Sequence, residues 1–237
     1  MKAANSLPLL LLSNRAWNDN LAKRLSDALS RPVYLFKHPQ ELQEKAIRSL
    51  NPEWIFVPHW SYIIPENIWS AWPTVVFHMT DLPYGRGGSP LQNLIQRGFS
   101  STKISALRCM ADVDAGPVYC QEPLSLDGSA EEIFMRADLL IEQMIKKIVL
   151  EKPEAIPQQG EPVFFSRRKP SQSNLANCPS GDLDAWFDQI RMLDADGYPH
   201  AFLEIQGIRL EFRRVSRRCD GLYADVRIVD TDQSSSG

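Results

Sequence analysis

The usual patterns of metal binding, dinucleotide binding and membrane crossing are missing from this sequence of 237 residues. Its four cysteines include no CxxC pair, which argues against a zinc site and fits free thiols in a reducing cytoplasm. No GxGxxG follows the first apolar run, so a dinucleotide site is not supported. That run, Leu7 to Ser13, is too short to span a bilayer and lacks a signal-peptide cleavage pattern. We therefore expect a cytoplasmic protein without a metal and without a membrane partner.

An excess of positive charge is also lacking. The chain has 26 Lys and Arg against 29 Asp and Glu, for a net charge of −3, and its 43% of hydrophobic residues is ordinary for a globular protein. Such a balance leaves no electrostatic footprint for general nucleic-acid binding, so no nucleic-acid partner is expected.

Short apolar runs that alternate with helical patterns fill the first half of the chain. This spacing predicts βαβ units, and strands that are apolar on both faces are typical of a parallel sheet covered by helices. The predicted fold class is therefore α/β, a Rossmann-like domain with a mostly parallel sheet. We expect strands at 7–12, 32–36, 54–60, 74–78, 103–110 and 117–126, and helices at 18–29, 38–50, 64–69, 91–96 and from Ser129 to before Pro153.

The composition changes after Phe165, where Ser, Asn and Pro become frequent. We expect a main domain at 1–165, a linker at 166–182 and a small β-rich subdomain at 183–237 that opens with a helix at 183–193. The apolar stretch 201–205 in that subdomain either forms a homodimer contact or belongs to its own core, and both interpretations stay open.

Two histidines, His59 and His78, fall at the carboxyl ends of predicted strands, where functional residues gather in parallel sheets. The stretch HMTDLPYGRGGSP begins at His78, and its glycines and prolines indicate a loop of defined conformation. Arg86 in this loop either binds an anionic group of a ligand or donates hydrogen bonds to loop carbonyls. Beside His59, Trp60 either lines a pocket by stacking on a ring or packs under the loop.

A second candidate stretch, CMADVDAGPVYCQ, places Asp112 and Asp114 between two strands. Asp112 fits an ordinary acidic turn. For Asp114, the DAGP sequence indicates an acidic residue held at a tight turn. A carboxylate that contacts His78 at the edge of the sheet would orient the imidazole.

Together these residues resemble the signature of the 10-formyltetrahydrofolate-dependent formyltransferases, typified by methionyl-tRNA formyltransferase. The pattern HxTxLPxxRGGSPLQ runs without a gap from His78 to Gln92, and Asp114-Ala115-Gly116 falls on the family's Asp-x-Gly turn. RRKP at 167–170 and the segment 190–210 are similar to the family's linker and to the start of its OB-like C-terminal subdomain.

The resemblance implies an N-formyltransferase with 10-formyltetrahydrofolate as formyl donor and no metal. It implies catalytic roles for His78 and Asp114, and no covalent enzyme intermediate. The same resemblance implies folate contacts by Leu82, Pro83, Arg86 and Asp112. Substrate contacts are expected from His59, Trp60 and Thr80.

One position departs from the family pattern. Where the family has a catalytic asparagine, two residues before the histidine, this chain has Val76, which cannot donate a hydrogen bond to an oxyanion. Candidate substitutes are a loop backbone N–H, Thr80 or Asn93.

The acceptor that best fits the short, acidic chain is the amine of a nucleotide-linked aminodeoxy sugar of surface-glycan pathways, as used by pseudaminic-acid-type sugar formyltransferases. Formylation of an aminoacyl group on a peptide-synthetase carrier or tRNA is the alternative. Val76 also leaves open a degenerate module that binds folate or sugar without turnover, and a formyl-folate hydrolase would use the same residues with water.

Overall fold

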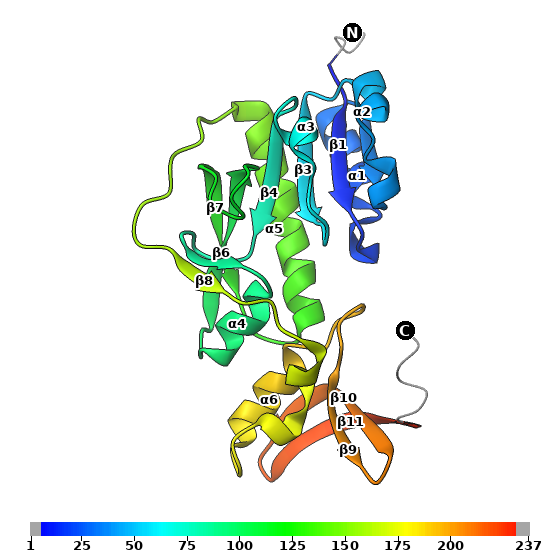
Figure 1. Ribbon diagram of the computed structural model, residues 1–237, viewed down its shortest axis with the longest axis vertical. Helices are drawn as coiled ribbons and strands as arrows, with labels where there is room; N and C mark the ends of the chain where they lie inside the picture. Colours follow the sequence, from blue (N-terminus) through cyan, green and yellow to red (C-terminus); the bar gives the residue numbers. More distant parts are fainter. Residues whose placement is uncertain (1–5, 231–237) are drawn as a thin grey trace. The chain divides into compact units, whose positions relative to one another are not determined.

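The computed structural model describes residues 6–230 and contains a six-stranded sheet with the strand order β2-β1-β3-β4-β6-β7 (Figure 1). Strands β1 to β4 run parallel, and β6 pairs antiparallel with β4, so the predicted mostly parallel α/β fold is confirmed. The bounds of these strands are β1 Leu9–Ser13, β2 Val33–Phe36, β3 Trp54–His59, β4 Thr74–His78, β6 Ser101–Arg108 and β7 Val118–Ser125.

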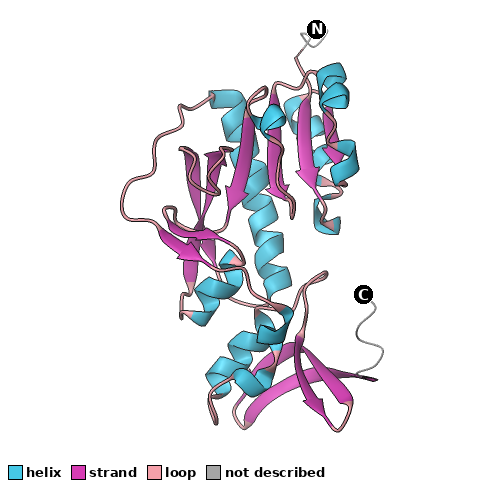
Figure 2. Ribbon diagram, viewed as in Figure 1, coloured by secondary structure: helices cyan, strands magenta, loops and turns pink. Residues whose placement is uncertain are grey.

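Helices alternate with the strands in the first half of the chain, as the apolar spacing predicts (Figure 2). They are α1 Leu21–Leu29, α2 Glu44–Leu50, α3 Glu66–Trp69, α4 Pro90–Gln96, α5 Ala130–Glu151 and α6 Leu183–Arg191, with short 3-10 turns at Ala16–Asn18, Pro39–Glu41, Pro170–Ser173 and Leu175–Asn177. None of the helices within residues 6–230 combines the length and the apolarity that crossing a bilayer requires.

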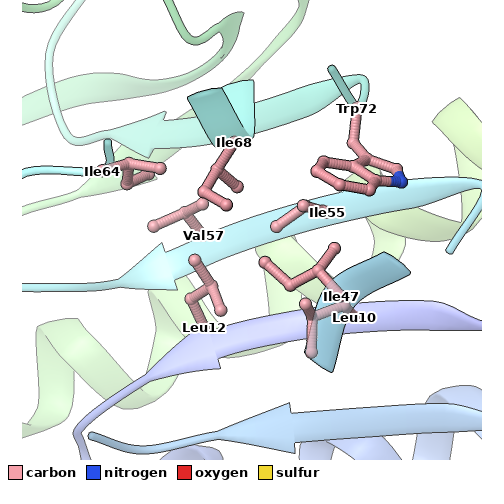
Figure 3. Close-up of a cluster of buried hydrophobic side chains, with 8 residues drawn as sticks. All are labelled: Leu10, Leu12, Ile47, Ile55, Val57, Ile64, Ile68 and Trp72. Carbon is pink, nitrogen blue, oxygen red and sulfur yellow. The ribbon is translucent and has the colours of Figure 1, made fainter. Parts of the chain in front are cut away.

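One face of the sheet packs against α2 and α3 through a cluster of buried aliphatic side chains and Trp72 (Figure 3). Ile47 of α2 and Ile68 of α3 lie over Leu10 and Ile55, and all four are at most 1% exposed. Burial of such side chains contributes about 1.5–3 kcal/mol each, so this face supplies much of the stability of the sheet. The other members of the cluster are Leu12, Val57, Ile64 and Trp72.

Polar contacts that are buried or partly buried connect α1 and the turn before it to α5. Arg24 of α1 donates to Asp138 and Glu142 of α5, at 2.7 and 2.6 Å, and Asn18 donates to Asp138. Burial raises the pKa of the Asp138 carboxyl, while the bonds from Arg24 and Asn18 lower it. Leu9 and Leu11 alternate with Leu10 along β1 and are also fully buried, so both faces of β1 are covered.

Two smaller sheets complete the described strands. β5 (Tyr84–Gly87) pairs with β8 (Val163–Phe165), a sheet that the apolar patterns do not predict. β9 (Ala201–Ile205), β10 (Ile208–Arg218) and β11 (Gly221–Asp230) form a three-stranded antiparallel sheet, which confirms the β-rich C-terminal part.

The chain divides into two compact units. The first contains the described parts of 1–87, 102–124 and 135–164, and the second contains 88–101, 125–134 and the described part of 165–237. The predicted boundaries after 165 and 182 remain predictions, and residues 231–237 of the predicted subdomain lie outside the described residues.

Candidate active site

His78 ends β4 with its imidazole held on both sides by protein groups. Its Nε2 lies 2.8 Å from the carbonyl oxygen of Gly85, and its Nδ1 lies 3.5 Å from Oδ2 of Asp114. Because a carbonyl oxygen can only accept, Nε2 carries a proton and donates to Gly85. The residue is 7% exposed, so the loop that contains Gly85 covers the ring.

Asp114 lies in the turn between β6 and β7 and meets His78 as the sequence predicts. Its φ of 55° is in the left-handed region, which aspartate tolerates better than most residues. Oδ2 accepts a hydrogen bond of 2.9 Å from the backbone N–H of Gly87. The same carboxylate oxygen therefore faces the imidazole and fastens the loop above it.

The tight turn after Asp114 requires a glycine. A Cβ at Gly116 would overlap the carbonyl oxygen of Arg108, which is backbone and cannot swing aside. The DAGP sequence thus fixes the position of Asp114 through steric fit at Gly116 as well as through hydrogen bonds.

Gln158 joins the two loops of the site, and no sequence motif points to it. Both Nε and Nη2 of Arg86 donate to its Oε1, at 3.1 and 2.8 Å. Its Nε2 lies 2.8 Å from the carbonyl oxygens of both Asp114 and Gly116. Gln158 sits in the loop between α5 and β8, two elements that Figure 1 labels. The structure therefore ties the Arg86 loop to the Asp114 turn through one amide.

For Arg86 this arrangement favours the structural alternative. Two of its five N–H donors, one on Nε and one on Nη2, bond Gln158, so the predicted folate contact would have to use the second N–H of Nη2 or those of Nη1. Leu82 is buried, Pro83 is partly buried and Asp112 is exposed. Their folate roles remain predictions.

Val76 offers the site no hydrogen-bond donor, and its environment is apolar. It lies opposite Leu107 of β6 and packs against the buried cluster of Figure 3. Asn93 is excluded as the substitute, because its amide nitrogen already contacts three carbonyl oxygens, those of Gly88, Ser89 and Ser166. Thr80 is fully buried, and its hydroxyl has no hydrogen-bond partner within residues 6–230.

His59 ends β3 and Trp60 follows it, at the same edge of the sheet as His78. His59 packs its ring at 5.6 Å from that of Trp17, edge on, and Trp60 packs against the buried cluster and contacts Tyr62 at 5.4 Å. For Trp60 the packing alternative is therefore observed, while a substrate contact of either residue remains a prediction. Within the described chain no group of three or more His, Cys, Asp and Glu could hold a metal ion.

Stability should fall in acid because of His59. Burial, and then the nearby Arg15, lower the pKa of His59 from 6.5 to about 4. The unfolded chain binds a proton at His59 below pH 6.5 and the folded chain does not, so folding weakens as the pH falls through this window. The loss should reach about 3 kcal/mol near pH 4.

Urea unfolding of the wild type and of His59→Gln at pH 7 and pH 4.5 measures how much unfolding free energy each protein loses on acidification. The variant should lose clearly less stability on acidification, whereas His38→Gln, at an exposed position after β2, should follow the wild type. Equal losses in all three proteins would contradict the assignment to His59.

The sequence and the structure of this chain are similar to those of known proteins. Residues 170–229 match the family model described as the methionyl-tRNA formyltransferase C-terminal domain. A methionyl-tRNA formyltransferase of Syntrophomonas wolfei is 27% identical over 206 residues, 82% of this chain. The chain spans 64% of that protein's length, and thus less than two thirds of it.

Solved structures agree. The structure named methionyl-tRNA formyltransferase from Clostridium thermocellum has 42% identity and a TM-score of 0.91, and the match covers 94% of this chain and 99% of that one. A sugar N-formyltransferase from a Shewanella species shares the fold, with a TM-score of 0.70 at 14% identity over 90% of this chain and 98% of its own. The chain therefore belongs to the formyltransferase family that methionyl-tRNA formyltransferase typifies.

Proposed function

We propose that this protein transfers a formyl group from 10-formyltetrahydrofolate to the amine of a nucleotide-linked aminodeoxy sugar. The observation that carries the proposal is the His78–Asp114 pair at the carboxyl edge of the sheet, beneath the loop 81–87. The folate donor fits the site chemically, because the loop offers apolar Leu82 and Pro83 while Thr80 has an unused hydroxyl within the described chain.

In this proposal the folate supplies the formyl carbon that the acceptor amine attacks. His78 donates from Nε2 to the formyl oxygen as negative charge develops there, and Asp114 keeps Nδ1 oriented. A new C–N bond forms as the bond to folate N10 breaks, and the proton lost by the amine moves to N10. Since Gly85 accepts from Nε2 in the present structure, its carbonyl has to give way to the formyl oxygen.

The choice of a small acceptor is based on the balance of charged residues in the C-terminal part of the chain. Residues 165–230 contain ten Lys and Arg and ten Asp and Glu. Five of these arginines form ion pairs with acids of the same unit, namely Arg191, Arg209, Arg214, Arg217 and Arg227. Proteins that bind tRNA gain most of their affinity from unpaired cations that contact phosphates. This balance supports a small acceptor.

Methionyl-tRNA is the second candidate, because the curated relatives and the structure with 42% identity carry that name. A peptide-synthetase carrier is the third acceptor to test.

An acceptor panel tests the proposal. The purified chain is incubated with 10-formyltetrahydrofolate and either nucleotide-linked 4-amino-4,6-dideoxy sugars, methionyl-tRNA or aminoacyl carrier protein, and tetrahydrofolate release is followed. Release with a sugar alone supports the proposal, and release with methionyl-tRNA alone selects the second candidate. If no amine promotes release, the transferase function is wrong.

Gln158 should act as a positioning residue. Gln158→Leu removes both the Arg86 contact and the bonds to the Asp114 turn, so we expect kcat to fall at least about tenfold, since small displacements of a catalytic group are costly. Gln158→Glu keeps an acceptor for Arg86 but loses the donor to the Asp114 and Gly116 carbonyls.

The comparison of these two variants separates positioning from stability. If the Asp114 turn is what matters, Gln158→Glu should lower kcat about as much as Gln158→Leu, with KM for the acceptor little changed. A kcat that follows thermal stability across the variants instead would assign Gln158 a purely structural role.

A further inference from the structure

The C-terminal three-stranded sheet has one apolar face that is partly uncovered. The register places Leu203, Leu210 and Ile228 opposite one another across β9, β10 and β11, and Ala201, Phe212 and Val226 likewise. Side chains of paired residues point to the same face, so one face is apolar. The opposite face carries ion pairs, such as Arg209 with Glu204 and Glu211.

Exposure is concentrated at one end of this apolar face. Near the other end, Arg217 of β10 lies over the Phe187 ring of α6 at 4.3 Å and pairs with Asp184. The exposed end contains Ile205, Ile208, Val226 and Ile228, with exposed fractions of 53%, 44%, 46% and 68%. Two of these four side chains, Val226 and Ile228, belong to β11, which has no neighbouring strand on its outer side among the described residues (Figure 1).

The backbone of β11 is oriented for pairing at this edge. Gln206 and Gly207, both with positive φ, form a two-residue turn that closes on the pair Ile205 and Ile208. Hydrogen-bonded and non-hydrogen-bonded pairs alternate from there. This alternation directs the backbone groups of Arg209 and Glu211 toward β11, and those of Val226 and Ile228 away from β10.

Among the self-pairings of β11 whose central residue directs its backbone groups outward, the charges favour the register centred on Val226. In antiparallel pairing of β11 with the same strand of a second copy, a two-fold axis at Val226 sets Asp225 opposite the partner's Arg227, and Arg227 opposite the partner's Asp225. An axis at Asp225 or at Arg227 would set like charges opposite each other, which is unfavourable. The axis at Val226 also brings outward-directed backbone groups together and joins the two apolar faces.

We propose that β11 pairs antiparallel with β11 of a second copy of this chain about Val226, so that two three-stranded sheets become one of six strands. Isologous contacts of this kind are self-complementary, and pairing removes an exposed edge that would otherwise favour aggregation. The proposal goes beyond the formyl-transfer function and does not depend on it.

Sedimentation of the 237-residue chain tests the pairing across about 1 to 100 μM, the range in which interfaces of moderate affinity dissociate. The wild type should be dimeric at the upper end. Val226→Lys should be monomeric throughout, whereas Leu150→Lys, at a 72% exposed position on α5, should sediment like the wild type. A wild type that stays monomeric, or a Val226→Lys protein that stays dimeric, overturns the proposal.

Charge reversal tests the register. Asp225→Lys and Arg227→Asp should each raise the dimer dissociation constant about tenfold or more, because each places two like-charged pairs across the axis. The double variant should regain wild-type dimerisation, although its intrachain pairs with Arg214 and Glu211 stay broken. Thermal unfolding should therefore report no recovery in the double variant. A double variant that dimerises no better than the single ones would overturn the register.

Discussion

His78→Gln should lower the rate of formyl transfer by about 10² to 10⁴-fold, the range of general acid–base catalysis. Glutamine can still donate from its amide to the Gly85 carbonyl, so the loop above the site should stay in place. It cannot become a cation or exchange a proton with Asp114, so the developing charge on the formyl oxygen loses its strongest donor. Folate affinity should change little, because the folate contacts are expected from the loop rather than from the imidazole.

Single-turnover kinetics with saturating acceptor, together with equilibrium binding of tetrahydrofolate, measure these two effects separately. His38→Gln, which is far from the site in sequence and exposed, is the matched control and should react like the wild type. If His78→Gln transfers the formyl group at a rate within about twofold of the wild-type rate, His78 has no catalytic role. Loss of folate binding together with activity would mean that the imidazole supports the loop instead.

Thr80→Val should lower formyl transfer by about 10² to 10³-fold, the effect of removing one oxyanion donor. The substitution keeps the shape of the side chain and deletes the buried hydroxyl that has no partner among residues 6–230. It should therefore cost little stability, since no protein hydrogen bond is lost. Because Val76 cannot donate and the Asn93 amide is already bonded, Thr80 is the side chain expected to supply this donor.

Placing the family's asparagine at position 76 provides a rescue experiment for the Thr80→Val variant. Val76→Asn in the Thr80→Val background should recover part of the lost rate, because the amide would point to the same sheet face as His78. Unchanged kcat in Thr80→Val would assign the oxyanion contact to a loop backbone N–H, the remaining candidate. Thermal unfolding of each variant controls for the polar substitution at an apolar position.

Local patterns account for the main sheet. Strands β1, β3 and β4 are buried on both faces, and continuous apolar runs are the signal for such strands. The resemblance to the formyltransferase signature also pairs His78 with Asp114, and the two side chains lie 3.5 Å apart. The parallel-strand rule does not account for this contact, because β6, which leads to the Asp114 turn, runs antiparallel to β4.

Contacts between distant segments could not be predicted in this way. β5 and β8 are short and separated by more than 70 residues, so neither shows a periodic pattern. Gln158 lies in a loop, and its role depends on Arg86 and Asp114 arriving beside it. Segments 88–101 and 125–134 group with the C-terminal residues through contacts such as Gln92 to Met192, which sequence order does not reveal.

Transfer of a ¹³C-labelled formyl group, followed by NMR, tests the central claim most directly. The protein is mixed with ¹³C-formyl tetrahydrofolate, with and without an amine acceptor from the panel. Formyl transfer predicts that the label appears as a formamide on the acceptor, one for each tetrahydrofolate released, and that without acceptor it stays on the folate. Label released as formate in the absence of acceptor would identify a hydrolase. Label that remains on bound folate in every mixture would contradict catalysis and leave a folate-binding module.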